Sequence, residues 1–431
     1  MLSLKQTIEY LFYLFVFLLP LQTRWILAPG NINNGYWEYG TFSIYGTEIL
    51  LWAILLLYFV YLIRTAKKEE RMWNLSARGG IFLSCLGLLS ISILSIAWAL
   101  NTQTAWLSTF RLIEAIALWV FVVNFSFHSR RLFWVIVSSG FVQSMFAVLQ
   151  FCTKNVFASK WLGMAAQSPI MFSGESVIET TCGRFLRAYG TFPHPNILGG
   201  FLAVAAILSI WLFLSSKNKM ESVISLLFVI ENMIGLGLTF SRSAYFAFIL
   251  SSIICLAMAI LYSKKSQQSQ KGIFITLVFI FFVLAFSILN QGLVFSRINA
   301  GSRLEQKSFF ERGELLQESI QIISRHPLLG AGIGNYTVAA HNEINPQKKS
   351  WEYQPVHSLY FLIASELGAL GFLFFLSAIF LVCAYSWHKK NFIGFCIITS
   401  FIVIGFFDHY LWSLYPGIML FWLGIGIATK K

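Results

Sequence analysis

Residues 222–262 have the sequence SVISLLFVIENMIGLGLTFSRSAYFAFILSSIICLAMAILY. This segment is almost wholly apolar and is roughly twice as long as the ~20 residues that one transmembrane helix needs. Near its middle, residues 239–243 (TFSRS) introduce polar groups and one charge. Because the hydrocarbon core of a membrane offers such groups no partners, we expect two membrane helices, at 222–240 and 243–262, joined by a tight turn that contains Arg242.

Apolar runs recur along the whole chain, and the composition excludes a water-soluble globular protein. Of the 431 residues, 57% are hydrophobic and only 11% are charged, whereas soluble domains average about 45–50% apolar and about 25% charged residues. The sequence therefore predicts one all-α polytopic membrane domain over 1–431. We expect about twelve transmembrane helices, at 8–28, 45–63, 80–99, 105–124, 132–152, 196–215, 222–240, 243–262, 272–290, 357–386, 391–407 and 411–428.

The distribution of basic residues predicts the orientation of these helices. If both termini are cytoplasmic, every short cytoplasmic connection carries at least two lysines or arginines, whereas the short outer connections at 29–44, 100–104 and 408–410 carry none. This asymmetry follows the positive-inside rule, so we expect a multi-pass protein of the plasma (inner) membrane with both termini in the cytoplasm. The basic residues assigned to the cytoplasmic side are Lys5, Arg64, Lys67, Lys68, Arg71, Arg78, Arg130, Arg131, Lys217, Lys219, Lys264, Lys265, Lys271, Lys389, Lys390, Lys430 and Lys431.

The composition also limits the partners and the chemistry. The net charge of +13 is explained by insertion signals and by contact with anionic membrane lipids, so it needs no nucleic acid as a partner. Aspartate occurs once, at Asp408, and none of the six cysteines forms a CxxC pair. Sites for magnesium, manganese or zinc therefore have few ligands, and we expect chemistry without a metal or a cofactor.

The remaining basic residues mark candidate sites. Most of them lie in two long outer segments, 153–195 and 291–356, and three arginines lie near the outer ends of helices: Arg24, Arg111 and Arg242. An arginine at the membrane edge is a candidate site because an unpartnered charge is costly there. Snorkelling of the side chain explains Arg24 equally well, and Glu114, one helical turn from Arg111, can pair with it.

The first long outer segment ends in a stiff motif, RAYGTFPHPN at 187–196. Arg187 and His194 can face an anionic ligand at the membrane edge, with Asn196 capping the helix that follows. Alternatively, the two prolines around His194 only fix the turn. In the 239–243 turn, Ser241 or Ser243 can cap the next helix and leave amides for an anion, to which Arg242 adds a guanidinium fork; the alternative is a solvated corner.

The second long outer segment contains an amphipathic helix, which we expect over 304–325. Arg312 falls on its apolar stripe, where a buried arginine needs an anion, whereas Arg325 closes the helix and either binds a ligand or complements the helix dipole. The stripe consists of Phe309, Leu316, Ile320 and Ile323, with Glu311, Glu314 and Glu318 off it.

A glycine-rich stretch, HPLLGAGIGNY at 326–336, comes next. It lacks the Gly-Lys-Ser/Thr ending of a nucleotide-binding loop and the preceding strand of a dinucleotide fold. Two interpretations remain, close backbone packing or presentation of amides to a lipid phosphate.

His357 opens the tenth expected helix. Its neutral imidazole can take a proton from a hydroxyl or orient a phosphate, or it can serve only as a cap. Glu366 follows nine residues later, about 180° around the helix, so we expect it to pair with another helix.

In this order, these motifs resemble those of the O-antigen ligase and O-antigen polymerase family of bacterial envelope glycosyltransferases. The motifs are RAYGTFPHPN (187–196), TFSRS (239–243), Arg312 followed by HPLLGAGIGN (326–335), and HSLY (357–360) followed by ELGALG (366–371). The resemblance implies a helical glycosyltransferase of the lipid-donor (GT-C) type, with an undecaprenyl pyrophosphate-linked saccharide as donor and a glycan or lipid as acceptor, and with no nucleotide or metal.

The resemblance also assigns roles to individual residues. It implies that Arg242 and Arg312 bind pyrophosphate and that His357 activates or positions the acceptor hydroxyl. Many members of the family have an aromatic residue shortly after the loop arginine, where this chain has Gly313-Glu314-Leu315-Leu316. Arg303 and Arg297 therefore stay alternatives to Arg312.

The expected reaction is a metal-independent transfer with inversion by direct displacement. The competing function is that of a twelve-helix transporter or flippase of lipid-linked saccharide. A transporter should show repeat symmetry between its halves and polar groups at the midplane. We find no internal repeat, although Glu231 and Asn232 form a polar pair within an apolar run. The gathering of arginine and histidine candidates on one side favours catalysis at the outer membrane surface.

Overall fold

The fold is a bundle of membrane-spanning helices. The computed structural model describes residues 3–65, 78–170, 175–180, 183–262, 266–298 and 303–430. Within these residues, each of the twelve expected spans overlaps one helix, which confirms the all-α polytopic architecture. These helices are α1 (Leu4–Leu18), α2 (Gly46–Thr65), α3 (Gly79–Ser95), α4 (Thr102–Asn124), α5 (Ser129–Thr153), α6 (Pro195–Leu214), α7 (Lys219–Leu238), α8 (Arg242–Tyr262), α9 (Ser266–Leu289), α13 (Leu359–His388), α14 (Phe392–Phe407) and α16 (Tyr415–Thr429).

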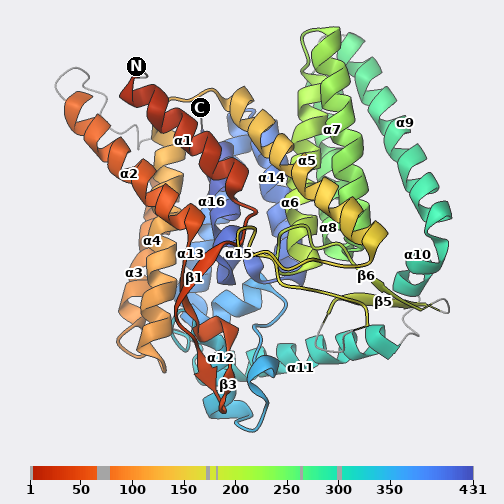
Figure 1. Cartoon of the computed structure of the whole chain (residues 1–431). Coiled ribbons are helices and arrows are strands. Elements are labelled where there is room, and N and C mark those ends of the chain that lie inside the picture. The colour runs from red at the N-terminus through yellow and green to blue at the C-terminus, as the bar shows by residue number, and fades with distance from the viewer. Residues whose placement is uncertain are drawn as a thin grey trace.

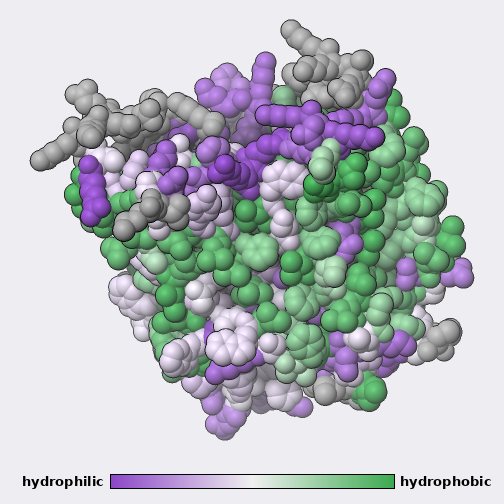
Figure 2. Space-filling view, turned by 45° about the horizontal axis from the view of Figure 1, so that its top comes forward, coloured by the Kyte–Doolittle hydropathy of each residue, from purple (hydrophilic) through white to green (hydrophobic). Residues whose placement is uncertain are grey.

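Eight of these helices are long and apolar enough to cross a membrane, and α3, α14 and α16 are shorter apolar helices. The two termini lie at one end of the bundle, and α11 and α12 lie at the other (Figure 1). In the space-filling view, a hydrophobic belt separates hydrophilic surfaces at the two ends (Figure 2). Six of the basic residues used for the orientation lie outside the described residues: Lys67, Lys68, Arg71, Lys264, Lys265 and Lys431.

The first expected span, 8–28, was wrong at both ends. Helix α1 starts at Leu4 and ends at Leu18, and Arg24–Ala28 forms strand β1 instead. Pro20 lies just after the helix, and proline cannot supply the N–H that another turn would need. Strand β1 pairs antiparallel with β4 (Phe42–Tyr45). The other described strands form two further two-stranded sheets, β2 (Asn31–Ile32) with β3 (Gly35–Tyr36) and β5 (Val177–Thr180) with β6 (Gly183–Leu186).

Helix α6 lies at the centre of the bundle. It packs against α5, α7, α8 and α14, and nearly all of its side chains are buried. Such a helix is apolar all round because neighbours cover every face. Its first residue, Pro195, stands at the α11 end of the bundle, so the centre of the fold positions the residues just before it.

The break between α7 and α8 lies at the expected place. Helix α7 ends at Leu238, α8 begins at Arg242, and Phe240 between them has a φ of 47°. A positive φ is uncommon outside glycine and marks a constrained turn. The expected pair of helices and the tight turn with Arg242 are therefore confirmed.

Helix α11 (Arg303–Arg325) runs across the end of the bundle, between α10 (Gln291–Ile298) and α12 (Tyr336–Ala339) (Figure 1), and packs against α13. The short helix α15 (Tyr410–Ser413) packs against α13 and α16. The amphipathic helix is confirmed, but the expected buried stripe was wrong. Leu315, Ser319 and Ile322 are buried, whereas Phe309 and Ile320 are about half exposed. Ser319 shares a hydrogen bond with Ser365 of α13, so polar as well as apolar contacts decide which face of α11 turns inward.

The glycine-rich stretch packs backbone to backbone against α13. The N–H groups of Ala331 and Gly332 donate to the carbonyls of Ser365 and Glu366, both at 2.9 Å. Helix α13 is broken at Gly368, whose φ is 62°, and this break frees the two carbonyls. Of the two interpretations of the stretch, close packing is therefore the one that the structure supports, because these amides are already used.

This packing leaves no room for a side chain at Gly330. A Cβ there would lie 2.3 Å from the carbonyl carbon of Glu366, at a φ of +70°. Gly330→Ala should therefore lower the free energy of unfolding by at least about 1–2 kcal/mol, the cost of the left-handed backbone alone. The measurement is thermal unfolding of the detergent-solubilised protein, followed by size-exclusion chromatography.

Gly313→Ala is the control for this substitution. Gly313 lies inside α11, and a Cβ there would meet nothing within 4 Å. Alanine is the better helix former by about 0.5–1 kcal/mol, so this variant should be as stable as the wild type or slightly more stable. Equal melting of Gly330→Ala and the wild type would contradict the packing that we describe.

Candidate functional site

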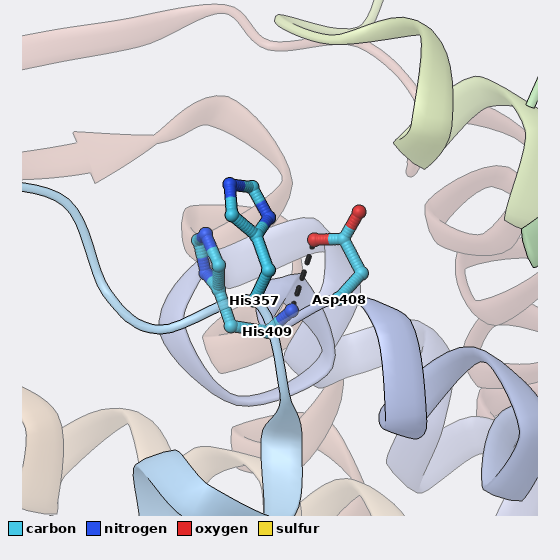
Figure 3. Close-up of side chains that lie close together, drawn as sticks. All are labelled: His357, Asp408 and His409. Atoms are coloured by element: carbon cyan, nitrogen blue, oxygen red, sulfur yellow. Dashed lines mark hydrogen bonds between the residues drawn. The ribbon is translucent and has the colours of Figure 1, made fainter. Parts of the chain in front are cut away.

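Three histidines and the single aspartate meet at the α11 end of the bundle. His194 precedes α6, His357 precedes α13, and Asp408 and His409 form the connection between α14 and α15. The ligand atoms of His357, Asp408 and His409 all lie within 4.8 Å of one another, and Figure 3 shows the three side chains together. The rings of His357 and His409 are 5.4 Å apart between centroids. Residues distant in sequence thus form one cluster.

The Asp408 carboxylate is held by two hydrogen bonds. Asn196 Nδ2 donates to Oδ2 and the backbone N–H of His409 donates to Oδ1, both at 2.9 Å (Figure 3 shows the second). Burial by itself would raise the pKa of Asp408, but His409, His357, His194 and Asn196 together hold it below its usual value. The cluster therefore contains a buried carboxylate anion.

The histidines beside this anion are neutral at physiological pH. Burial lowers the pKa of His357, with Arg312 adding to the effect and Asp408 opposing it. Burial also lowers the pKa of His409 to about 4 and that of His194 to about 3. Nδ1 of His357 is buried and has no hydrogen-bond partner within the described residues. His357 is therefore an uncharged base with a free ring nitrogen.

His194 caps α6 and so corrects the expectation that Asn196 does. Its Nδ1 accepts a hydrogen bond from the backbone N–H of Asn196 at 3.1 Å. Because His194 is the cap, the Asn196 side chain makes other contacts: it donates to Asp408 and accepts from Arg187 at 2.7 Å. The stiff Pro-His-Pro-Asn turn therefore fixes the backbone and at the same time joins the aspartate to an arginine.

Arg187 is a buried hub whose donors are taken by the protein. Nε donates to the carbonyl of Thr239 at 2.7 Å, one terminal nitrogen donates to Ser176 Oγ at 2.8 Å, and the other donates to Asn196. Burial, reinforced by Arg297, lowers the pKa of Arg187 to about 9, so it stays positively charged. It ties the α7–α8 turn to the aspartate cluster.

Arg242 lies in a second group, with Glu305 and Arg297. One terminal nitrogen of Arg242 is 3.0 Å from Glu305 Oε2, and the other donates to the carbonyl of Arg297 at 3.2 Å. Arg297 also pairs with Glu305 and donates to the carbonyl of Phe240. The Arg242 side chain is 40% exposed and lies over the ring of Phe309. The turn is thus covered by α10 and α11 and is not a bare solvated corner.

Arg312 makes no hydrogen bond or ion pair with any residue that the structure describes. It is partly buried, and burial lowers its pKa; Arg242 acts in the same direction, and Asp408 and Glu305 oppose. Arg312 therefore lies in electrostatic reach of both groups, and its guanidinium is free for a ligand.

Together the two groups carry excess positive charge. Arg187, Arg242, Arg297 and Arg312 face two buried carboxylates, Glu305 and Asp408. A third carboxylate within electrostatic reach of His357, that of Glu311, is paired with Lys307 at 3.6 Å. Isolated charge in a partly buried site is unfavourable, so this arrangement favours an anionic ligand.

Two other candidate arginines lie elsewhere. Arg325 pairs with Glu343 at 3.6 Å, and thirteen residues of helix, about 20 Å, separate it from Arg312. Arg303 is 71% exposed and pairs with Glu179 at 3.0 Å. Of the alternatives to Arg312, only Arg297 belongs to the described cluster.

The only constellation in the described chain with metal-ligand geometry is His357, Asp408 and His409. Both Asp408 oxygens already accept hydrogen bonds, His409 Nδ1 lies 2.7 Å from Ser413 Oγ, and the nearby positive charge of Arg312 opposes a second cation. With these partners, the cluster is better suited to holding and moving a proton than to binding a metal ion.

Sequence reasoning missed Asp408, His409 and Glu305. Asp408 is the only aspartate in the chain, and it lies at the end of an apolar helix, a signal that could have identified it. Glu305 had no comparable signal, because its pairing with Arg242 and Arg297 depends on how α11 folds over the turn.

Comparison with known proteins agrees with this geometry. A family model described as O-antigen ligase matches residues 224–376, a segment that contains Arg242, Arg312 and His357. No curated protein matches the sequence. The match supports the resemblance of the motifs between residues 224 and 376 to the O-antigen ligase family, and with it a glycosyltransferase activity of the O-antigen ligase or polymerase kind in a multi-pass membrane protein.

Proposed function

We propose that the protein transfers a saccharide from an undecaprenyl pyrophosphate-linked donor to an acceptor hydroxyl at the outer face of the inner membrane. The observation that carries the proposal is Arg312, which has no ion-pair partner among the described residues and interacts electrostatically with both Arg242 and the neutral base His357. A pyrophosphate between a lipid and a sugar has one ionised oxygen on each phosphorus. This charge matches the excess of the arginine cluster.

Arg242 and Arg312 hold the pyrophosphate in this scheme. A guanidinium fork matches phosphate oxygens in a bidentate manner, and fixed donors stabilise the charge that develops on the leaving group. Arg187 does not contact the pyrophosphate in this scheme, because its donors hold the Asn196 side chain and the Thr239 carbonyl; it positions the residues that do. His194 supports the same turn, and Arg325 is too distant to share in it.

His357 accepts the acceptor's proton. The acceptor oxygen attacks the anomeric carbon, the bond from this carbon to the phosphate oxygen breaks, and the lipid pyrophosphate leaves with the electron pair. The proton passes to the ring of His357, and the nearby Asp408 carboxylate stabilises the imidazolium that forms. Direct displacement from the face opposite the leaving group inverts the anomeric centre. No metal takes part, because the arginines supply the positive charge.

The membrane arrangement follows from the same proposal. Both termini face the cytoplasm, where most of the basic connections lie, and the α11 end faces outward. The polyprenyl chain of the donor lies among the helices and membrane lipids, and its head group reaches the arginines.

A transporter is less consistent with the structure. Asn232, the buried polar group that a carrier could use, lies 3.4 Å from Ser209 and donates to the carbonyl of Phe228. The Ser209 contact joins α6 to α7, and both contacts occupy the amide nitrogen of Asn232. The candidate arginines and histidines instead gather at the α11 end of the bundle.

The orientation predicts which positions a membrane-impermeant thiol reagent reaches. In a chain whose native cysteines are replaced by serine, Gln347→Cys should react in cells with an intact inner membrane, and Lys219→Cys should react only after permeabilisation. Both side chains are exposed, so a difference in labelling shows on which side of the membrane each position lies. The reverse pattern would overturn the orientation and move the site to the cytoplasm.

Removing either ligand-binding arginine should impair transfer. Arg242→Gln and Arg312→Gln each remove charged hydrogen bonds worth about 1.5–3 kcal/mol, so the rate should fall roughly ten- to a hundred-fold. The measurement is transfer by the purified protein from lipid-linked donor extracted from the native cells.

Arg303→Gln is the matched control for Arg242→Gln. Arg303 also pairs with one glutamate at 3.0 Å but lies outside the cluster, so this variant should transfer at close to the wild-type rate. Equal rates in Arg242→Gln, Arg312→Gln and Arg303→Gln would show that Arg242 and Arg312 do not bind the donor.

The proposed reaction uses no metal, so the wild-type rate should also persist in EDTA.

Substitution of His357 should separate binding from chemistry. A general base contributes about a hundred- to ten-thousand-fold, so His357→Ala should nearly abolish transfer. Its affinity for the lipid-linked donor should stay near that of the wild type, because the arginines remain. Weakened donor binding that matches Arg242→Gln would instead make His357 a phosphate ligand.

The pH profile supplies a second test of His357. A base must be unprotonated, and the pKa of His357 lies below its usual value of about 6.5. Transfer should therefore be constant from pH 7.5 to 6.5 and should fall only at lower pH. The charged groups that act on the ring are Asp408, Arg312 and Glu311. The pKa of Asp408 is below its usual value and that of His409 is about 4, so neither group titrates in this range.

A further inference from the structure

A second cavity adjoins the histidine cluster and contains none of the four clustered arginines. It lies among β1, the segment 38–45 with β4, the outer halves of α4 and α13, the segment 333–337, and the α15–α16 segment. Its polar lining includes Arg24, Glu38, Arg111 and Glu366. The mechanism proposed above assigns these groups no role.

The cavity is joined to the site through His409. The ring of Tyr39, a lining residue, is 6.0 Å from that of His409 between centroids, and Ser413 Oγ, also in the lining, is 2.7 Å from His409 Nδ1. Asp408, the preceding residue, instead contacts Asn196 and thereby Arg187. The aspartate–histidine pair therefore has the arginines on one side and this cavity on the other.

Arg111 is the cavity's unpaired cation. Within the described chain it makes no ion pair or hydrogen bond, its Nε is buried without a partner, and it lies 6.0 Å from the centre of the Tyr45 ring. Glu114, the alternative partner one turn away, interacts electrostatically with Arg111 but forms no ion pair with it within 4 Å; its Oε1 accepts a hydrogen bond from Trp52 at 2.7 Å. The guanidinium donors of Arg111 are thus free for a bound molecule.

The other charged groups of the cavity are already partnered and include two carboxylates. Arg24 and Glu38 form a two-pronged ion pair at 2.5 and 2.9 Å. Glu366 accepts from Trp412 Nε1 at 2.9 Å, which confirms the expectation that it pairs with another helix. Carboxylates in the wall disfavour a pyrophosphate, so this cavity is not a second donor site.

The remaining lining suits a saccharide. The aromatic residues Tyr39, Tyr45 and Trp412 offer flat apolar faces, and such rings combined with a few fixed polar groups are typical of small-molecule sites. Sugar hydroxyls can donate to the carboxylates and accept from Arg111. A sugar presents both kinds of surface at once, with apolar C–H faces and a hydroxyl rim.

We propose that this cavity binds the acceptor saccharide and that Arg111 is a specificity-determining residue for it. The inference rests on the proposed function, since it gives the acceptor a place that adjoins His409, whose ring is 5.4 Å from that of His357, and that is separate from the pyrophosphate. It also explains why an unpaired arginine stands at the membrane edge without joining the arginine cluster.

The test compares the two substrates in one variant. Transfer by purified protein in nanodiscs is measured against the concentration of the glycolipid fraction from the native cells, and donor affinity is measured separately. Arg111→Gln should raise the KM for the acceptor about ten- to a hundred-fold through loss of a charged hydrogen bond, with donor affinity unchanged. Arg242→Gln should weaken donor binding and leave the acceptor KM nearly unchanged. Retained donor affinity also shows that Arg111→Gln is folded.

Two outcomes would overturn the inference while the proposed function stands: an unchanged acceptor KM in Arg111→Gln, or a loss of donor affinity in that variant. A binding measurement separates the two proposals further. Oligosaccharide released from the cells' surface polysaccharide by mild acid should give saturation-transfer NMR signals with His357→Ala, and these should vanish when Arg111→Gln is added. If the wild type transfers no glycan but this Arg111-dependent binding is present, the proposed function fails and the saccharide site stands.

Discussion

The buried contact between Asp408 and Asn196 is the link on which the rest of the site depends. It joins the end of α14 to the start of α6, the central helix of the bundle, and through Arg187 it continues to the α7–α8 turn. A carboxylate in this place requires donors and positive charge, because burial of an unpaired anion is very costly. Asn196 and the backbone N–H of His409 supply the donors, and Arg312 supplies positive charge within electrostatic reach. The same requirement keeps His357 next to an anion that can stabilise its protonated form.

This arrangement separates two kinds of ligand on either side of His357. On one side, four arginines exceed their carboxylates and suit a pyrophosphate; on the other, aromatic rings and paired charges around Arg111 suit a sugar. In a direct displacement, the acceptor oxygen and the leaving pyrophosphate lie on opposite faces of the anomeric carbon. Separate sites for the acceptor sugar and the pyrophosphate meet this requirement. In the proposed function the membrane adds a further constraint, since the lipid part of a polyprenyl-linked donor would stay among the helices while its head group reaches the site.

The sequence predicted those features that depend on local pattern. Hydropathy located the helices, and the polar residues at 239–243 located the break between α7 and α8. The sequence-based prediction was wrong where tertiary contacts determine the end of a helix, its buried face or the partner of a side chain. The end of α1 depends on the pairing of β1 with β4, and the inward face of α11 depends on contacts such as Ser319 with Ser365. The side-chain positions of Arg111 and Glu114, which share one helix but form no ion pair within 4 Å, also depend on tertiary contacts such as that of Trp52 with Glu114. Asp408 and His409 enter the site only because α14 ends beside α6 and α13, a neighbourhood that one sequence does not reveal.

The measurement that tests the central claim most directly is electron cryomicroscopy of the His357→Ala protein in nanodiscs with the lipid-linked saccharide bound. The account predicts pyrophosphate density within hydrogen-bonding distance of both Arg242 and Arg312, with the first sugar directed toward position 357. Density for the pyrophosphate at the opposite end of the bundle, or beside Arg325 and Glu343, would contradict it.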